Sequence, residues 1–275
     1  MNNSDEAEVN LLWTGGWDST FRLLYLVFVE KRVVQPFYIV DTERSSTLHE
    51  LRAMHVIREE IAKRDSRLAD LIKPTIIVSV HDIKPDPEIT AKFNRLREKL
   101  HIGSQYEWLA RFAKQWKIPN LELGVHKGDH AYILLSKYIQ RLELCIERSE
   151  NAPNILDLLS KYVDNDSKIK QINEDDDVSI FSYFSFPLLK ISKEDMKRIA
   201  AEKGFLDILE KTWFCHTPWH NRPCGTCTPC DLTIEEGFGY RIPKVSKLRR
   251  KIWIIIRYLT NIKRKVMLLL WRRSK

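Results

Sequence analysis

Five short apolar segments alternate with stretches of helical periodicity, and this alternation leaves the chain few possible folds. The apolar segments are residues 9–13, 36–40, 75–80, 121–125 and 179–184. The helical stretches are residues 18–30, 47–62, 103–116, 130–147 and 192–203. Strands that alternate with helices predict a Rossmann-like α/β fold, a parallel sheet with helices on both faces. In such folds, ligands bind at the carboxyl ends of the strands, near the switch in strand order.

Composition excludes several classes of protein. With 44% hydrophobic residues, the chain can form a packed core and is not disordered throughout. The apolar run Leu23–Val29 is too short to span a membrane. The first ten residues, MNNSDEAEVN, lack the basic start and apolar core of a secretory signal. We therefore expect the protein in the cytoplasm.

The net charge of +8 comes from one end of the chain. Residues 241–275 contain 13 of the 45 basic residues and no acidic residue, which leaves 32 basic against 37 acidic residues elsewhere. The main body is therefore mildly acidic, and we expect no sequence-specific binding of nucleic acid. We divide the chain into a main domain (1–210), a cysteine-rich segment (211–240) and a basic tail (241–275). Residues 164–178 are acidic and predict a surface loop; Asp175, Asp176 and Asp177 either face water or hold magnesium.

The segment TGGWDST, residues 14–20, lies between the first predicted strand and the first predicted helix. Gly15 and Gly16 allow the backbone to approach an anion, and the helix N-terminus attracts phosphate. Thr14, Ser19 and Thr20 supply hydroxyl groups, while Asp18 can stabilise the helix start or hold magnesium. The alternative is a plain glycine turn capped by Asp18 or Ser19. The segment is not a Walker P-loop.

Four of the five cysteines lie within sixteen residues, at Cys215, Cys224, Cys227 and Cys230. In a chain without a secretion signal, this cluster indicates metal binding rather than disulfides. Two C-x-x-C turns beside a more distant cysteine predict a closed zinc site with four thiolate ligands. The alternatives are His216 or His220 as ligands, or an iron–sulfur cluster. We expect the fifth cysteine, Cys145, to be a buried, inert thiol.

Residues 248–275 contain no glycine or proline and predict one long helix. Its apolar residues recur at steps of three and four and form a stripe, but basic residues interrupt it, so it is too charged to span a bilayer simply. We consider three alternatives for this stripe. It could pack on the protein's own body or on a second copy in a homodimer, lie on an anionic membrane surface, or dock on an acidic partner or nucleic acid. Trp253 and Trp271 with their basic neighbours would suit a headgroup boundary.

Residues 14–20 resemble the S-G-G-x-D-S signature of PP-loop ATP pyrophosphatases, and further segments resemble the 7-cyano-7-deazaguanine synthase family and its antiphage-defence relatives. These segments are Asp41–Arg44, His49–Leu51, Phe186–Leu188, Ile191–Asp195, Thr212–Cys215, Cys224–Cys230 and Gly237–Phe238. The similarity runs in order over roughly residues 9–240. It implies the PP-loop, or adenine nucleotide alpha hydrolase, type of Rossmann-like fold, with a C-terminal zinc-binding segment. It also implies use of ATP and Mg²⁺.

The resemblance implies a ligase that adenylates a deazapurine-like carboxylate, such as 7-carboxy-7-deazaguanine, and transfers it to ammonia or another amine. Thr14, Gly15, Gly16, Ser19 and Thr20 would then bind ATP, together with Asp41 and Gly124. Lys193 would approach the phosphates, and Asp18 and Asp129 would contact magnesium or substrate. His49 and Glu50 could touch substrate, although Glu50 could simply be exposed on its helix.

The chain departs from the family at two substrate-reading segments. Residues 103–106, GSQY, stand where the synthase has an arginine–asparagine pair, and residues 124–130, GVHKGDH, lack its Tyr-Pro-Asp-Cys segment. Two alternatives to queuosine synthesis therefore remain open. The chain could attach a deazaguanine to a partner protein in a defence system, or it could bind adenine nucleotide without catalysis as a subunit of a larger system.

Overall fold

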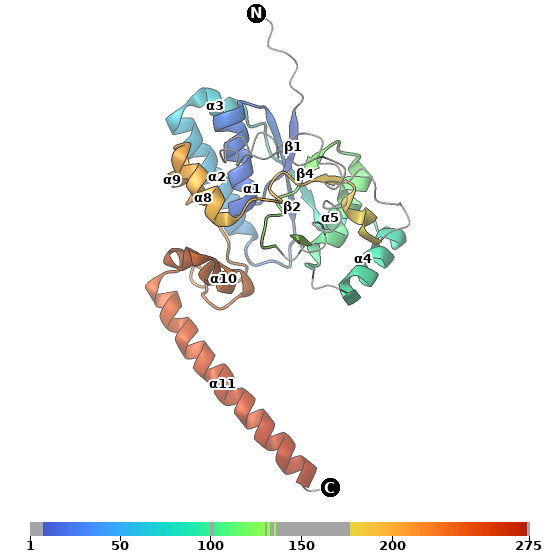
Figure 1. The fold of residues 1–275 in the computed structure, drawn as a ribbon, viewed down its shortest axis with the longest axis vertical. Helices are drawn as coiled ribbons and strands as arrows, with labels where there is room; N and C mark the ends of the chain where they lie inside the picture. The colour runs from blue at the N-terminus through green and yellow to red at the C-terminus, as the bar shows by residue number, and fades with distance from the viewer. Residues whose placement is uncertain (1–7, 100–101, 130, 133–134, 136–176, 274–275) are drawn as a thin grey trace, which may run out of the picture. The chain divides into compact units, whose positions relative to one another are not determined.

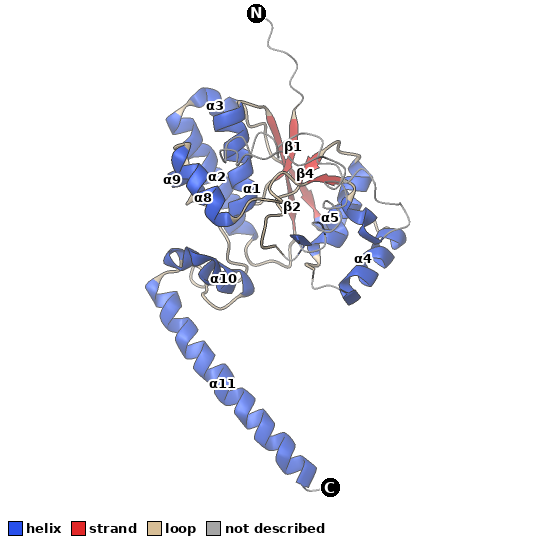
Figure 2. Cartoon of the chain, in the orientation of Figure 1, coloured by secondary structure: helices blue, strands red, loops and turns tan. Residues whose placement is uncertain are grey.

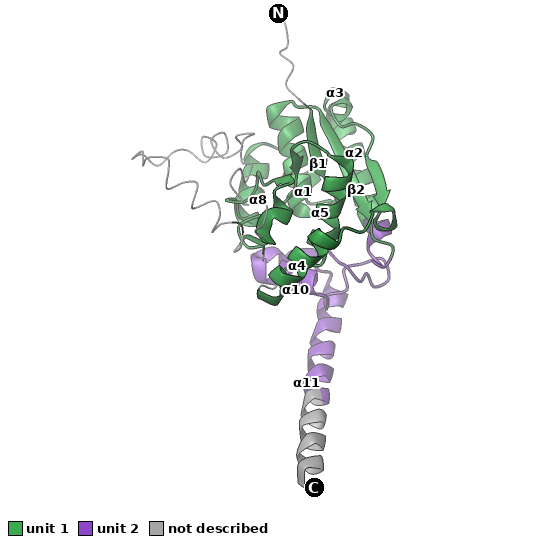
Figure 3. Cartoon of the chain, turned by 90° about the vertical axis from the view of Figure 1, so that its right-hand side faces the viewer, with its two compact units in different colours: residues 1–42, 50–212 green, residues 43–49, 213–275 purple. Residues whose placement is uncertain are grey.

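The computed structural model describes residues 8–99, 102–129, 131–132, 135 and 177–273. The chain forms two compact units, residues 1–42 with 50–212 and residues 43–49 with 213–275 (Figure 3). The first unit contains the sheet, and the second contains the cysteine cluster and the C-terminal helix.

The sheet of the first unit has five parallel strands in the order β3-β2-β1-β4-β5 (Figure 2). The strands are β1 (Val9–Leu12), β2 (Val34–Val40), β3 (Ile76–Ser79), β4 (Leu121–Glu122) and β5 (Phe184–Ser185). Leu11 of β1 lies opposite Pro36 of β2 on one side and Glu122 of β4 on the other. The chain builds outward from β1 to β3 and then returns to the other side of β1, so the switch in strand order lies between β1 and β4. This confirms the predicted α/β fold.

Helices cover both faces of the sheet (Figure 1). One face carries α1 (Trp17–Tyr25), α2 (Thr47–Arg64), α3 (Ser66–Asp70), α8 (Lys193–Glu202) and α9 (Leu206–Leu209), and the other carries α4 (Pro87–Lys99) and α5 (Gln105–Trp116). Aromatic rings fill both interfaces. The ring centroids of Phe21 in α1 and Phe205 are 6.1 Å apart, and those of Phe37 in β2 and Phe112 in α5 are also 6.1 Å apart. The apolar faces of these amphipathic helices thus form the core.

Most predicted helices are confirmed. The first predicted helix is α1 followed by a π-helical turn, η1 (Leu26–Glu30), and the second, third and last are α2, α5 and α8. The predicted helix 130–147, with Cys145, lies almost entirely outside the described residues. Helix α4 was not predicted. It begins at Pro87, a residue favoured in the first helical turn, and the Asp86 carboxylate accepts a hydrogen bond from the Ile89 N–H at 3.1 Å.

The predicted fifth strand, residues 179–184, is wrong in its position. Residues Asp177–Phe181 form a 3₁₀ helix, η3, and only Phe184–Ser185 pair with β4. The Ser182 backbone and side chain both donate hydrogen bonds to the Ser179 carbonyl, at 3.0 and 2.7 Å. These local bonds favour a turn over an extended strand.

The predicted fourth strand is shorter than expected, because the chain turns after Glu122 and the Val125 N–H donates to the Leu123 carbonyl at 2.9 Å. Most of the predicted acidic loop, with Asp175 and Asp176, lies outside the described residues. The Asp177 carboxylate is paired with Arg95 at 2.7 Å and with Lys99 at 3.3 Å. These pairs argue against Asp177 as a magnesium ligand.

The second unit contains α10 (Thr228–Thr233), the π-helical turn η4 (Ile234–Phe238), the 3₁₀ turn η5 (Gly239–Arg241) and α11 (Lys244–Arg273). The predicted tail helix is therefore confirmed as α11. Among the described helices, none has the length and apolar character needed to cross a membrane.

Candidate functional site

The loop that follows β1 requires glycine at its first turn. Gly15 has a φ of +69°, and a Cβ atom built on it would lie 2.9 Å from the Glu50 carbonyl oxygen and 3.1 Å from the Met54 side chain. Both the left-handed backbone and the close approach of α2 therefore exclude a larger residue. The loop is held in a narrow space between β1 and α2.

Hydroxyl groups organise the same loop. Ser19 Oγ accepts a hydrogen bond from the Thr14 N–H at 3.3 Å and lies 3.4 Å from Thr14 Oγ1, which accepts from the Gly16 N–H at 3.4 Å. Gly16 is the N-cap of α1 and supplies no capping side chain. The first N–H groups of α1 therefore converge on the end of this loop, the arrangement that attracts phosphate.

We expected the Thr20 hydroxyl to contact a phosphate, but in the structure it is bonded within the protein. Its side chain is fully buried and accepts a hydrogen bond from Trp13 Nε1 at 2.9 Å. The Thr20 N–H donates to the Gly16 carbonyl at 3.1 Å. Thr20 therefore anchors the loop to the core, because both its hydroxyl and its N–H are used internally.

The chain after β4 passes directly over the start of α1. A Cβ atom on Gly124 would lie 3.3 Å from the Ser19 backbone nitrogen and 3.4 Å from Asp18 Cβ. His126 follows, almost fully buried, with its Nε2 3.9 Å from Asp18 Oδ1. Within the described part of the chain, Asp18 Oδ1 and His126 Nδ1 are buried without a hydrogen-bond partner. Buried polar atoms normally have a hydrogen-bond partner, and a bound ion, ligand or water could supply one here.

Asp129 joins this group. Its carboxylate accepts hydrogen bonds from the Ala131 N–H at 2.8 Å and from the Tyr106 hydroxyl at 3.3 Å. Burial, followed by the charges of Asp129 and Asp18, raises the pKa of Tyr106 well above its ordinary value. Tyr106 is therefore a neutral hydroxyl donor that holds Asp129 in place. Sequence reasoning missed both Tyr106 and His126 as site residues, although both lie in the segments that depart from the family pattern.

Lys193 and Asp41 occupy the same unit. Lys193 is the first residue of α8, whose start is fixed by a capping box between Ser192 and Asp195. The Lys127 N–H donates to the Ile191 carbonyl at 3.0 Å, so the start of α8 lies beside the loop that follows β4. Asp41 directly follows β2, at the same edge of the sheet as the loop after β1.

The two residues of the predicted histidine/glutamate helix have different surroundings. Glu50 is buried, and its carboxylate accepts a hydrogen bond from the Tyr38 hydroxyl at 2.7 Å, so the alternative that it is exposed is wrong. His49 belongs to the second unit, where its ring stacks on Trp213 with centroids 4.6 Å apart.

A buried ion pair links the helix that follows the glycine loop to strand β4. Arg22 of α1 donates two hydrogen bonds to Glu122 of β4, at 2.7 and 2.8 Å, and one to Glu30 at 2.7 Å. Burial alone would lower the pKa of Arg22, but the two carboxylates outweigh it and raise that pKa above its ordinary value. This guanidinium therefore stays charged and fixes α1 relative to β4, the two elements whose ends carry Ser19 and Gly124.

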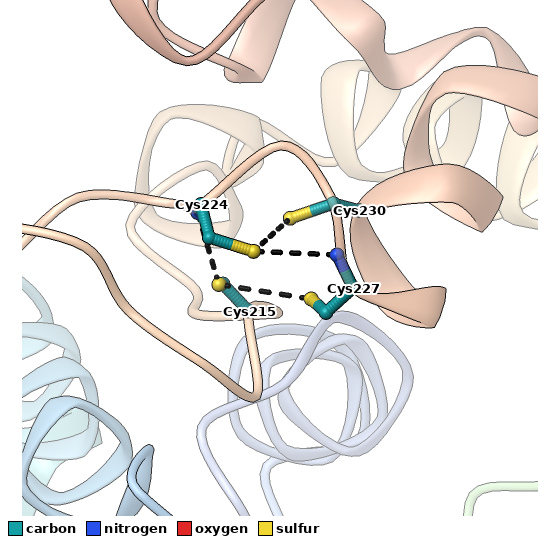
Figure 4. Close-up of side chains that lie close together, drawn as sticks. All are labelled: Cys215, Cys224, Cys227 and Cys230. Atoms are coloured by element: carbon teal, nitrogen blue, oxygen red, sulfur yellow. Dashed lines mark hydrogen bonds between the residues drawn. The ribbon is translucent and has the colours of Figure 1, made fainter. Parts of the chain in front are cut away.

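In the second unit, the four clustered cysteines point toward one another (Figure 4). Their sulfur atoms all lie within 4.8 Å, with Cys215 and Cys227 3.8 Å apart and Cys224 and Cys230 3.9 Å apart. Four sulfurs bound tetrahedrally to zinc at about 2.3 Å lie about 3.8 Å from one another. The cluster therefore fits zinc. His216 and His220, the alternative ligands, are exposed and outside it.

Backbone N–H groups donate hydrogen bonds to the cysteine sulfurs. The Cys224 N–H donates to Cys215 Sγ at 3.1 Å, and the Gly225 N–H donates to Cys230 Sγ at 3.3 Å. The hydrogen bond from Cys215 lowers the pKa of Cys227, and the same bond raises that of Cys215 to about 12. The metal-free cluster therefore keeps protons that a bound metal must displace.

Comparison with known proteins shows similarity to one family model over part of the chain. Residues 109–239, just under half of the chain, match the family model described as queuosine biosynthesis protein QueC. The matched range begins within α5 and contains β4 and the four clustered cysteines, and the loop at residues 14–20 lies outside it. No curated protein matches the chain. The match supports the family resemblance stated from the sequence over residues 109–239.

Proposed function

We propose that this QueC-like chain is a PP-loop ATP pyrophosphatase that activates a carboxylate with ATP, releases pyrophosphate and transfers the acyl group to an amine in the cytoplasm. One observation carries the proposal. The glycine loop after β1 and the acidic groups after β4 meet at the switch in strand order, where α/β folds bind ligands.

The loop residues would bind the phosphates of ATP. Gly15 and Gly16 bring the backbone close to an anion, and the start of α1 favours negative charge. Ser19 would donate its hydroxyl to a phosphate oxygen in place of its present bonds to Thr14. Lys193 would add a positive charge toward the phosphates. Asp41 and Gly124 would line the remainder of the nucleotide site.

The acidic pair is suited to a divalent cation. Asp18 has a buried carboxylate oxygen without a hydrogen-bond donor, and Asp129 has a fixed orientation. Carboxylate oxygens are preferred Mg²⁺ ligands, and Mg²⁺ bound there would neutralise charge on the phosphates. His126, 3.9 Å from Asp18, would orient this carboxylate.

The reaction itself needs activation because oxide is a poor leaving group from a carboxylate. A carboxylate oxygen would attack the α-phosphorus of ATP, the bond from that phosphorus to the β-phosphate oxygen would break, and pyrophosphate would leave. An amine would then attack the acyl carbon and displace AMP, which gives an amide and releases a proton. The protein would contribute mainly by positioning the reactants and by neutralising charge.

The family supports a 7-carboxy-7-deazaguanine-like carboxylate as the substrate, with ammonia as the simplest amine. A second candidate is attachment of the deazaguanine to an amine of a partner protein. The departures at residues 103–106 and 124–130 favour it, because they alter the segments that read the purine in the synthase. A third candidate is nucleotide binding without catalysis.

The test is to incubate the protein with ATP labelled at the α-phosphate, 7-carboxy-7-deazaguanine and ammonium. We expect labelled AMP, an equal amount of pyrophosphate and an amide product detected by mass spectrometry. Ser19→Ala should abolish most of the AMP formation, whereas Ser45→Ala, an exposed serine after β2, should not. ADP with phosphate would contradict the proposal.

Two further outcomes separate the candidates. If AMP forms only when co-expressed proteins are added, and one of these gains the mass of a deazaguanine acyl group, the acceptor is a protein. If ATP binds but no AMP forms with any carboxylate or acceptor, the chain is a nucleotide-binding subunit.

A further inference from the structure

Over residues 244–258, whose side chains the structure describes, helix α11 packs in the second unit through one side. Ser246 is buried, and its carbonyl oxygen would lie 2.6 Å from a Cβ atom built on Gly225. Arg249 donates to the Cys224 carbonyl at 2.8 Å, and Arg250 donates to the Gly225 carbonyl at 3.2 Å. The polar side of the first turns therefore fixes α11 to the cysteine loop.

The opposite side of these turns is apolar and exposed. Val245 is 39% exposed, Leu248 59%, Ile252 52% and Ile255 58%. In a helix, these residues share one face, roughly opposite to Ser246 and Arg250. The stripe was expected to pack on the protein's own body or on a second copy, and over these residues it has no cover within the second unit.

The spacing of the apolar residues along α11 favours another helix as the partner. Steps of three and four alternate without interruption from Val245, and the sequence continues them through the rest of α11 at Leu259, Ile262, Val266 and Leu269. A strict period of 3.5 places these residues at the a and d positions of four heptads, the pattern of a coiled coil.

We propose that a second copy of this chain covers this seam, so that two α11 helices form a parallel coiled coil over residues 245–269. At 1.5 Å per residue, the seam is about 36 Å long. The first and last heptads pair a valine at a with a leucine at d, Val245 with Leu248 and Val266 with Leu269, the combination that favours two strands.

Charge favours the parallel orientation. In parallel helices, g positions face e positions of the next heptad in the other copy, which places Lys251 opposite Ile256, Tyr258 opposite Lys263 and Lys265 opposite Leu270. An antiparallel pair centred on the seam would place Lys251 opposite Lys265, two like charges. The parallel pair leaves Lys244 opposite Arg249, and Arg249 is already held against its own cysteine loop.

The experiment is sedimentation equilibrium of the full chain at low and high salt. We expect a concentration-dependent species of twice the chain mass of 32.5 kDa, and tighter association at high salt because screening weakens repulsion between the basic helices. Ile252→Asp with Ile255→Asp should weaken association at least a hundredfold. The matched control is Ile254→Asp, which is 48% exposed but lies off the seam and should retain the dimer.

Two further measurements test whether the seam variant is folded and whether the two helices are parallel. Circular dichroism and zinc content show whether the seam variant remains folded. In a Cys145→Ser background, Leu248→Cys should form a disulfide between copies, because Leu248 occupies a d position near one end of a parallel pair and would be far from its counterpart in an antiparallel one.

Three outcomes would overturn the proposal. They are a chain that stays monomeric throughout, a dimer unaffected by the seam variant, and a failure of Leu248→Cys to cross-link. Binding to phosphatidylserine vesicles by a monomeric chain, weakened by salt, would assign the same face to lipid instead.

Discussion

Arg22→Met removes the positive charge that holds Glu122 in the interior. The side chains of Arg22 and Glu122 are 2% and 7% exposed, and the guanidinium makes three hydrogen bonds to two carboxylates. Leaving one member of a buried pair without its partner costs about 3–5 kcal/mol. Since domains are stable by only about 5–15 kcal/mol, we expect the free energy of unfolding of the first unit to fall by about 4 kcal/mol.

The assay is urea denaturation followed by circular dichroism. The double variant Arg22→Met with Glu122→Leu should recover much of the loss, because it no longer buries a charge. Lys63→Met, which breaks an exposed pair with Glu60 at 2.9 Å, is the control and should leave the midpoint nearly unchanged.

The loss of stability in Arg22→Met should depend on pH. In Arg22→Met, the orphaned Glu122 carboxyl should bind a proton on folding, so the folded state holds more protons and the deficit should shrink as pH falls. A loss below about 1 kcal/mol at neutral pH, or a double variant as unstable as the single one, would refute the reasoning.

The other predictions concern the two candidate sites and the tail. Cys227→Ser should release zinc, measured by metal analysis, and loosen the second unit; full zinc retention would argue against a four-thiolate site. For the unchanged cluster, zinc affinity should fall as pH is lowered, because protons compete for the sulfurs. Gly15→Ala should be destabilised more than Gly204→Ala in urea, since both have positive φ but only Gly15 is crowded. Asp18→Ala should lower pyrophosphate release strongly without changing the melting curve. Deletion of residues 251–275 should abolish dimerisation but leave pyrophosphate release intact, and a loss of both would contradict separate roles.

The order of strands and helices could be predicted because each element has a local signal. The segment at residues 9–20 combines a buried apolar strand with glycines and a helix start, and its geometry depends little on distant residues. Spacing likewise sufficed to bring the four cysteines together as a group that could hold zinc, since two short turns place three sulfurs side by side.

The remaining features depend on contacts that no local pattern contains. Arg22 would be expected on the solvent side of its helix, and its partner Glu122 lies 100 residues away. Tyr106 and Asp129 meet only because α5 packs beside the loop after β4. The aromatic residues near Phe181 suggested a strand over residues 179–184, but the bonds of Ser182 to Ser179 form a turn there, and pairing with β4 starts only at Phe184.

If two copies pair through α11, the contact between Gly225 and Ser246 would make metal supply a determinant of quaternary structure. The loop that carries Cys224 and Cys227 is the surface on which the first turn of α11 rests, and it has no room even for one additional methyl group. A chelator that opens this loop would remove the support at which the coiled coil starts. Zinc and subunit association would therefore be thermodynamically linked: zinc would strengthen the dimer, and the dimer would in turn retain zinc more tightly.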